Sequence, residues 1–279
     1  MIKSILLPID GSVYSETVLQ YGIFLAKKFK SVLRILTIVD IRLYEWNLAA
    51  GADTFVPVMP SSEFQEESQR MQDEKADKVL EKAKNILKDS KLTYELVKTS
   101  GIPVDEILVY SKTNDLVIMG IRGEYERWSN SLLGATVEAV TRQISKPVLL
   151  TEKSFETPKR IHCGYDGSSA ALKALQFAAY FASSLKIKVQ ILAVFDEEDE
   201  REAVLDEAEK YISPYNVEFQ LRHETGDGTE VLINAQNSAP NASLMIIGSY
   251  GRSRLREAIL GSTTVQVMRK AAKPVLLAK

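Results

Sequence analysis

The sequence contains the stretch Ser4-Ile-Leu-Leu-Pro-Ile-Asp10-Gly-Ser12 near its start and a second version of it, Arg160-Ile-His-Cys-Gly-Tyr-Asp166-Gly-Ser168, at an offset of 156 residues. Each version is a short apolar run followed by Asp-Gly-Ser, a pattern that predicts a buried strand ending in a turn. Further pairs match in the same order along the chain: Leu36–Asp40 with Leu192–Asp196, Leu116–Gly120 with Leu244–Gly248, and Lys146–Leu150 with Lys273–Leu277. Chance likeness would not keep one order, so the chain is a tandem duplication.

The chain has 279 residues, of which 45% are apolar and 26% are charged. These are ordinary values for a globular protein, and the length suits two domains. We predict a first domain over residues 1–153 and a second over residues 158–279. The single cysteine, Cys163, excludes a disulfide framework, and a formal net charge of −2 disfavours a strongly basic nucleic-acid binder.

An insertion distinguishes the first half from the second. The offset between matching segments falls from 156 to 128 after Asp40, which places the extra residues at about 41–62. This stretch contains glycine and prolines and shows no clean hydrophobic period, so we expect a long surface loop. A lid over a ligand, or a partner surface that uses Tyr44 and Trp46, is the alternative.

Targeting and membrane segments are not expected. No apolar run reaches the roughly 20 residues that a membrane-spanning helix needs. The opening Met1–Asp10 is too short and too soon interrupted for a signal peptide, and it reads as a buried strand. We therefore expect a soluble, cytoplasmic protein that binds neither membrane nor nucleic acid.

Strands and amphipathic helices alternate in each half. Strand-helix alternation with apolar strands predicts a parallel α/β sheet with helices on both faces, which binds ligands at the carboxyl ends of its strands. In the first half we expect strands over 2–9, 32–39, 92–98, 116–119 and 147–150, and helices over 15–29, 63–88, 103–111 and 133–144. In the second half we expect helices over 169–185, 199–212, 229–237 and 263–271.

Residues suited to bind an anion are concentrated after the predicted strand that ends at Gly248. The sequence there reads Gly248-Ser-Tyr-Gly251-Arg-Ser-Arg-Leu-Arg-Glu-Ala-Ile-Leu-Gly261-Ser262-Thr263. Glycines let backbone amides approach an anion, and the helix that follows offers free N–H groups and a positive dipole end. The segment also supplies hydroxyl groups, at Ser262 and Thr263, and positive charge at Arg252. Together these features predict a phosphate-binding site.

These residues resemble the nucleotide-binding motif Gly-x2-Gly-x9-Gly-(Ser/Thr) of the universal stress protein family, and residues 248–262 match it in full. The resemblance extends over both halves, so the whole looks like a tandem universal stress protein. It implies a five-stranded parallel sheet in each half, of the adenine nucleotide alpha hydrolase-like type. It also implies binding of ATP or another adenine nucleotide, with Mg²⁺.

The resemblance assigns roles in the second half. Asp166 is expected to meet the ribose or the adenine, with Gly164 and Tyr165 beside it as the adenine wall. Val194 is expected to offer backbone polar groups to the adenine edge. The phosphates are assigned to Gly248, Gly251, Arg252, Gly261, Ser262 and Thr263.

The first half departs from the motif. Ten residues, not nine, separate Gly123 from Gly134, and Ala135 stands where a hydroxyl is expected. Carboxylates in this loop, Glu124 and Glu126, would repel phosphates unless turned away, although two arginines oppose that effect. The first half is therefore expected to bind nucleotide more weakly than the second. Its candidate residues are Asp10, Ile38, Gly120, Gly123, Gly134 and Thr136.

Other kinds of site are disfavoured. The P-loop pattern and the dinucleotide-binding Gly-x-Gly-x-x-Gly are absent. Neighbours on a strand point to opposite faces, so His162 and Cys163 read as ordinary strand residues and not as metal ligands. No catalytic residue and no metal site are expected.

The terminal strands Val148–Leu150 and Val275–Leu277 are, by the resemblance, dimer strands that pair antiparallel. A tandem chain satisfies this contact internally as a pseudo-dimer, and further homodimerisation stays open. The leading functional hypothesis is adenine-nucleotide binding in a stress-response or regulatory role with an unidentified protein partner. Two alternatives stay open: slow ATP hydrolysis or phosphoryl transfer, with Asp166 as the carboxylate within reach, and a scaffold that binds no nucleotide.

Overall fold

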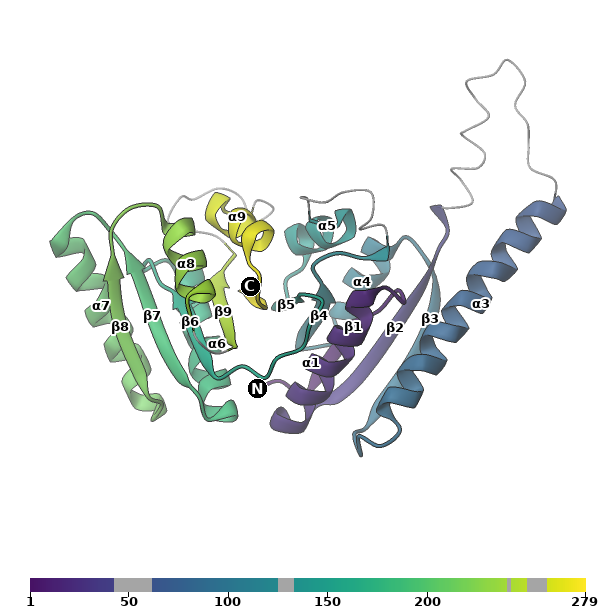
Figure 1. Cartoon of the computed structure of the whole chain (residues 1–279), viewed down its shortest axis with the longest axis horizontal. Helices are drawn as coiled ribbons and strands as arrows, with labels where there is room; N and C mark the ends of the chain where they lie inside the picture. Colours follow the sequence, from purple (N-terminus) through teal and green to yellow (C-terminus); the bar gives the residue numbers. More distant parts are fainter. Residues whose placement is uncertain (43–61, 125–132, 240–241, 250–259) are drawn as a thin grey trace, which may run out of the picture.

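The computed structural model describes residues 1–42, 62–124, 133–239, 242–249 and 260–279. In the first half the elements are β1 (Ser4–Pro8), α1 (Val13–Phe29), β2 (Val32–Asp40), α3 (Ser62–Leu87), β3 (Tyr94–Gly101), α4 (Pro103–Ser111), β4 (Leu116–Gly120), α5 (Ala135–Gln143) and β5 (Val148–Thr151). In the second half they are β6 (Arg160–Gly164), α6 (Ser169–Leu185), β7 (Lys188–Val194), α7 (Glu198–Ile212), the short 3₁₀ helix η2 (Ser213–Tyr215), β8 (Phe219–Glu224), α8 (Gly228–Asn237), β9 (Ser243–Gly248), α9 (Ser262–Lys270) and β10 (Val275–Ala278). The two halves repeat one order of strands and helices (Figure 1).

Within the described residues, ten strands form one sheet in the order β3-β2-β1-β4-β5-β10-β9-β6-β7-β8. Neighbouring strands of the same half are parallel. The halves meet where β10 runs antiparallel to β5, with Val275 opposite Leu150 and Leu277 opposite Val148. The expected pairing of the terminal strands is present, and it makes the two half-sheets continuous.

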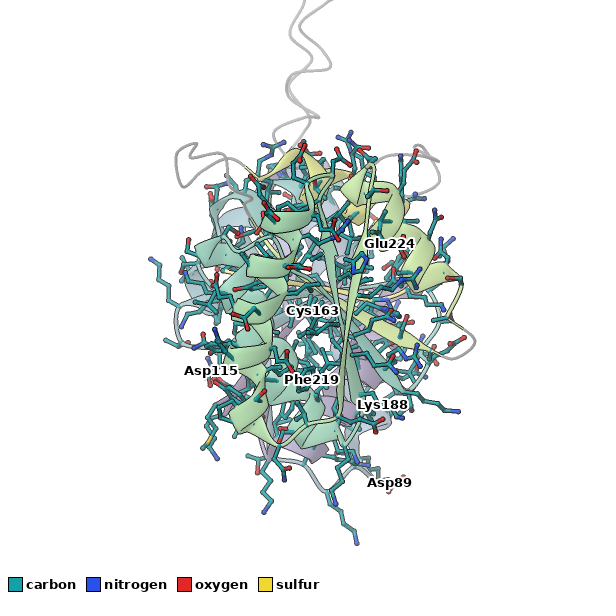
Figure 2. All side chains as sticks on the ribbon, turned by 90° about the vertical axis from the view of Figure 1, so that its left-hand side faces the viewer. Asp89, Asp115, Cys163, Lys188, Phe219 and Glu224 are labelled. Atoms are coloured by element: carbon teal, nitrogen blue, oxygen red, sulfur yellow. The ribbon has the colours of Figure 1, made fainter. Side chains whose placement is uncertain are left out.

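Helices cover both faces of the sheet, which explains why the central strands are apolar throughout. Buried residues of α1, α3, α6 and α7 form one core, and those of α4, α5, α8 and α9 form the other. Alternate residues of β1 divide between them, with Ile5 and Leu7 in the first core and Leu6 in the second. In Figure 2, Cys163 of β6 lies inside the molecule, where it is fully buried.

The Asp-Gly-Ser turns begin the helices that follow β1 and β6. Gly11 and Gly167 have φ angles of 81° and 74°, a left-handed conformation that glycine adopts without steric cost. Each turn leaves its aspartate, Asp10 or Asp166, at the carboxyl edge of the sheet.

The segment that connects the halves packs on α1. Phe155 contacts the ring of Tyr21 with 4.7 Å between centroids, and the Tyr21 hydroxyl donates a hydrogen bond of 3.0 Å to the carbonyl of Glu156. Burial raises the pKa of Tyr21 to about 12. Farther along α1, Phe29 meets Phe181 of α6 at 5.0 Å. These contacts hold the two halves together in addition to the β5–β10 pairing.

The predicted bounds of the strands and helices agree closely with the observed ones, with one informative difference. The bounds of α4 and α6 are as expected, whereas β3 begins and ends later than the expected 92–98 because it pairs with β2 as far as Gly101 opposite Asp40. Most of the insertion, residues 43–61, lies outside the described residues. Among the described helices, none has the length and apolar character to cross a membrane.

Candidate ligand sites at the carboxyl edge of the sheet

The first half contains a cavity at the point where the strand order reverses. β1 lies between β2 and β4, so the chain leaves β1 toward one side and later returns on the other. Parallel sheets open a crevice at the strand carboxyl ends at such a point. Here the cavity has a volume of about 780 Å³, and its walls come from the ends of β1, β2 and β4, from α3 and α4, and from the start of α5.

This cavity collects the first-half candidates. All six of them line it: Asp10, Ile38, Gly120, Gly123, Gly134 and Thr136. The rest of the wall is largely aliphatic and includes Val39 of β2, Val79 of α3 and Ile107 of α4. The arrangement can enclose an apolar ring and present polar groups at its rim.

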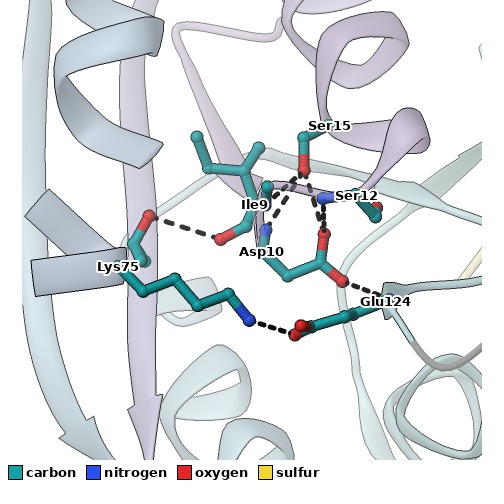
Figure 3. A network of polar contacts seen from close by, with 8 residues as sticks. Ile9, Asp10, Ser12, Ser15, Lys75 and Glu124 are labelled. Carbon is teal, nitrogen blue, oxygen red and sulfur yellow. Dashed lines mark hydrogen bonds and ion pairs between the residues drawn. The ribbon is translucent and has the colours of Figure 1, made fainter. Parts of the chain in front are cut away.

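The carboxylate of Asp10 is held on both of its oxygens (Figure 3). Oδ1 accepts hydrogen bonds from the amide of Ser12 at 2.9 Å and from the hydroxyl of Ser15 at 3.0 Å. Oδ2 accepts from the amide of Glu124 at 2.9 Å. A Cβ at Gly123 would lie 2.6 Å from Oδ2, so a larger residue there would have to displace the Asp10 carboxylate. In this arrangement Asp10 fixes the loop that follows β4, in addition to facing the cavity.

Two ion pairs stand at the same cavity, and sequence analysis did not find them. Lys75 of α3 pairs with Glu124, and both side chains are 42% exposed (Figure 3). Arg42 pairs with Asp40 through its Nε at 2.9 Å and a terminal nitrogen at 2.6 Å. Comparing the aligned halves could have revealed the first pair, because Lys75 aligns with Glu200, and Glu124 with Arg252.

The described ends of the two glycine-motif segments are joined by equivalent backbone hydrogen bonds in both halves. The amide of Gly134 donates a 3.2 Å hydrogen bond to the carbonyl of Ile121, and the amide of Gly261 donates a 3.1 Å bond to the carbonyl of Ser249. The additional residue between Gly123 and Gly134 therefore lies, in sequence, between two ends that are hydrogen-bonded as in the second half. This explains how the longer spacing leaves the start of α5 in place.

In the second half, the residues assigned to the adenine lie at the ends of β6 and β7. Gly164 ends β6, Val194 ends β7, and Tyr165 follows β6 with 2% of its surface exposed. The Tyr165 hydroxyl donates a 2.7 Å hydrogen bond to Oε1 of Glu207 in α7. Burial, with that carboxylate beside it, raises the pKa of Tyr165 above its usual value. Oδ1 of Asp166 accepts from the amide of Ser168 at 3.0 Å.

The described residues assigned to the phosphates lie at the end of β9 and the start of α9. Gly248 ends β9 and Gly261 caps α9, while Ser262 and Thr263 are exposed in its first turn. A Cβ at Gly248 would lie 2.7 Å from backbone of α6, so the strand end needs glycine for packing. Gly251 and Arg252 lie outside the described residues. The described part offers backbone amides and hydroxyls suited to an anion.

The histidine and cysteine of β6 are core residues. His162 and Cys163 are both fully buried, and His162 Nδ1 lies 3.0 Å from Oε1 of Gln190. Burial raises the pKa of Cys163 to about 12, which keeps the thiol protonated. In the part of the chain that the structure describes, no group of three or more His, Cys, Asp or Glu residues could hold a metal ion.

Fold and site together define a tandem α/β protein with a candidate ligand site at the carboxyl edge of each half-sheet. The model of the universal stress protein family matches residues 1–152 and again residues 157–279. The chain therefore belongs to the universal stress protein family, and it contains two copies of the family's domain in tandem.

Several known proteins are similar to this chain over nearly its whole length. A universal stress protein of Synechocystis sp. is 29% identical and covers 99% of both chains. One of Mycobacterium bovis is 25% identical over 97% of this chain and 95% of its own. A crystal structure of a universal stress protein from Archaeoglobus fulgidus has a TM-score of 0.74 at 24% identity, covering 99% of this chain and 96% of that one, which is a likeness in fold.

Proposed function

We propose that this universal stress protein binds an adenine nucleotide, with ATP as the leading ligand, and that its main site is in the second half. The observation that carries the proposal is the complete Gly-x2-Gly-x9-Gly-Ser spacing from Gly248 to Ser262, which follows a buried strand and ends at a helix start. The amides and hydroxyls at the start of α9 suit the phosphates. Gly164, Tyr165, Asp166 and Val194 stand at the neighbouring strand ends, within the same edge of the sheet.

The roles of these residues follow from their chemistry. The carboxylate of Asp166 accepts hydrogen bonds from ribose hydroxyls or the adenine amino group, and Tyr165 supports the wall beside it. Gly248, Gly251, Gly261, Ser262 and Thr263 hold the phosphates, and Arg252 adds positive charge. Mg²⁺ would neutralise part of the phosphate charge. The proposed setting is cytoplasmic and regulatory, with domains over residues 1–153 and 158–279 acting as an intramolecular pseudo-dimer.

Matched variants of the two halves test this proposal. Gly261→Val and Gly134→Val change equivalent positions, since both glycines cap the helix after the motif loop. Each variant is checked for folding by circular dichroism and titrated with Mg·ATP by calorimetry. We expect Gly261→Val to weaken ATP binding at least tenfold and Gly134→Val to leave the tightest site intact.

The nucleotide content of the purified protein provides a second measurement. The chain is denatured, before and after soaking in Mg·ATP, and released nucleotides are identified chromatographically. About one ATP per chain supports the second-half site, and recovery as ADP would point to hydrolysis. Absence of any nucleotide after soaking would refute the proposal and favour a scaffold role.

A further inference from the structure

The cavity of the first half differs in chemistry from the nucleotide site proposed for the second. We propose that it binds a nucleoside, the uncharged base-and-ribose part of a nucleotide, and rejects polyphosphate chains. This inference rests on the proposed function, because it assumes that the adenine-binding edge is shared by both halves. It assigns the two halves to different ligands.

The size and lining of the cavity suit a nucleoside. Its volume of about 780 Å³ is within the range of ordinary small-molecule sites. Aliphatic side chains from both covering faces, such as Val79 of α3 and Val104 of α4, form walls that can sandwich a flat ring. Ile38, two residues before the end of β2, also lines the cavity, where its backbone could serve the edge of a base as a hydrogen-bond partner.

The charges of the cavity do not suit a phosphate chain. Among the described residues, its lining has as many carboxylates as cations, namely Asp10, Asp40 and Glu124 against Arg42, Lys75 and Arg122. Two of the cations form ion pairs with two of these carboxylates, Arg42 with Asp40 and Lys75 with Glu124. A polyphosphate would have to displace them and would then face the released carboxylates.

The position of Glu124 makes the repulsion specific. Its amide donates to Asp10 and its carboxylate pairs with Lys75, so the residue is held between the end of β1 and α3 (Figure 3). It directly follows Gly123, the second glycine of the motif, where the amide would face a phosphate. At the helix that would receive the phosphates, Ala135 lacks a hydroxyl.

The second half carries the opposite charges at the aligned positions. Arg252 stands in the sequence where the first half has Glu124, and Glu200 of α7 aligns with Lys75 of α3. The alignment of the helices is fixed by their buried residues, since Ala83 and Ala208 are both fully buried. A double exchange, Lys75→Glu with Glu124→Arg, therefore gives the first half the second-half charges without changing the net charge of the chain.

Photo-crosslinking of the intact chain tests where each ligand binds. The probes are 8-azidoadenosine and 8-azido-ATP, and the labelled peptides are assigned to residues 1–153 or 158–279 by mass spectrometry. We expect the first half to be labelled by azidoadenosine at concentrations at least tenfold below those needed with azido-ATP. Comparable labelling of the first half by azido-ATP, or no labelling of it by azidoadenosine, would overturn the inference.

The double exchange tests the cause of the discrimination. It should improve azido-ATP labelling of the first half at least tenfold relative to azidoadenosine labelling of the same half. The control exchanges an ion pair outside the cavity, between Asp77 of α3 and Lys98 of β3, as Asp77→Lys with Lys98→Asp. Asp77 Oδ1 and Lys98 Nζ lie 2.7 Å apart. An unchanged preference in the first exchange, or an equal change in the control, would refute the role of Glu124. Failure of azido-ATP to label the second half would refute the proposed function, separately from these results.

Discussion

The buried histidine of β6 should make stability depend on pH in the mildly acidic range. Burial lowers the pKa of His162 from its ordinary 6.5 to about 4; its contact with Gln190 opposes this shift, and the charge of Arg160 adds to it. Its Nε2 is buried and has no hydrogen-bond partner among the described residues. A proton added there would place a charge in the core without compensation, so the folded chain resists protonation.

The sign and size of the effect follow from the two pKa values. Between pH 6.5 and 4 the unfolded chain binds the proton and the folded chain does not, so the free energy of unfolding falls as the pH falls. Well above pH 6.5 His162 is neutral in both states and the free energy of unfolding has its full value. Once the pH has fallen below 4, His162 has lowered that free energy by about 3 kcal/mol. About 2 kcal/mol of this should disappear between pH 7.5 and pH 5.

Urea unfolding at several pH values between 5 and 7.5 measures this loss. The His162→Leu variant should lose about 2 kcal/mol less than the parent over this range, whatever its stability at pH 7.5. The matched control is His223→Gln, because His223 is the other histidine of the chain and lies exposed on β8. Parallel pH profiles for the parent and His162→Leu would refute the reasoning, as would a flatter profile for His223→Gln.

Two further pairs of substitutions test the local packing. The Ser168 side chain caps α6 by accepting from a backbone amide at 3.1 Å, so Ser168→Ala should cost about 1 kcal/mol in urea unfolding. At the equivalent position Ser12 makes no such capping bond, and Ser12→Ala should cost less than half as much. Gly248→Ala should cost about 1–3 kcal/mol, because the new Cβ would meet the α6 backbone at 2.7 Å. At Gly228 a Cβ would have no neighbour within 4 Å, so Gly228→Ala should be neutral or stabilising by at most about 1 kcal/mol in the same assay.

The fold was predictable from sequence because the duplication represents each strand and helix by two matching segments of the chain. Two helices have the bounds that we predicted. Helix α4 begins at Pro103, and α6 ends at Leu185, before Lys186, whose φ is 58°. The strand β3 was harder, since it lies at the sheet edge and its side chains alternate between half-buried and exposed. Its end is determined by pairing with β2, which is a long-range contact that no local pattern contains.

The candidate residues of the first half all line one cavity, but the sequence did not indicate their polar partners. Ser15 is a helix residue and Lys75 belongs to a strongly charged helix, so each reads locally as ordinary. The contact of Ser15 with Asp10 spans only 5 residues, whereas the pair of Lys75 with Glu124 spans 49 and the hydrogen bond from Glu124 to Asp10 spans 114. Such contacts depend on how helices pack over the sheet, which hydrophobic periodicity does not determine.

The two halves can differ in ligand because the backbone of the site and its charges are held by different interactions. The motif loops are anchored by backbone hydrogen bonds at Gly134 and Gly261, which no side-chain exchange removes. The charges are carried by a half-exposed ion pair, Lys75 with Glu124, and such pairs contribute about 0–1 kcal/mol to stability. Reversing that pair should therefore change the ligand preference while costing little stability, so that one duplicated scaffold can hold two chemically distinct sites.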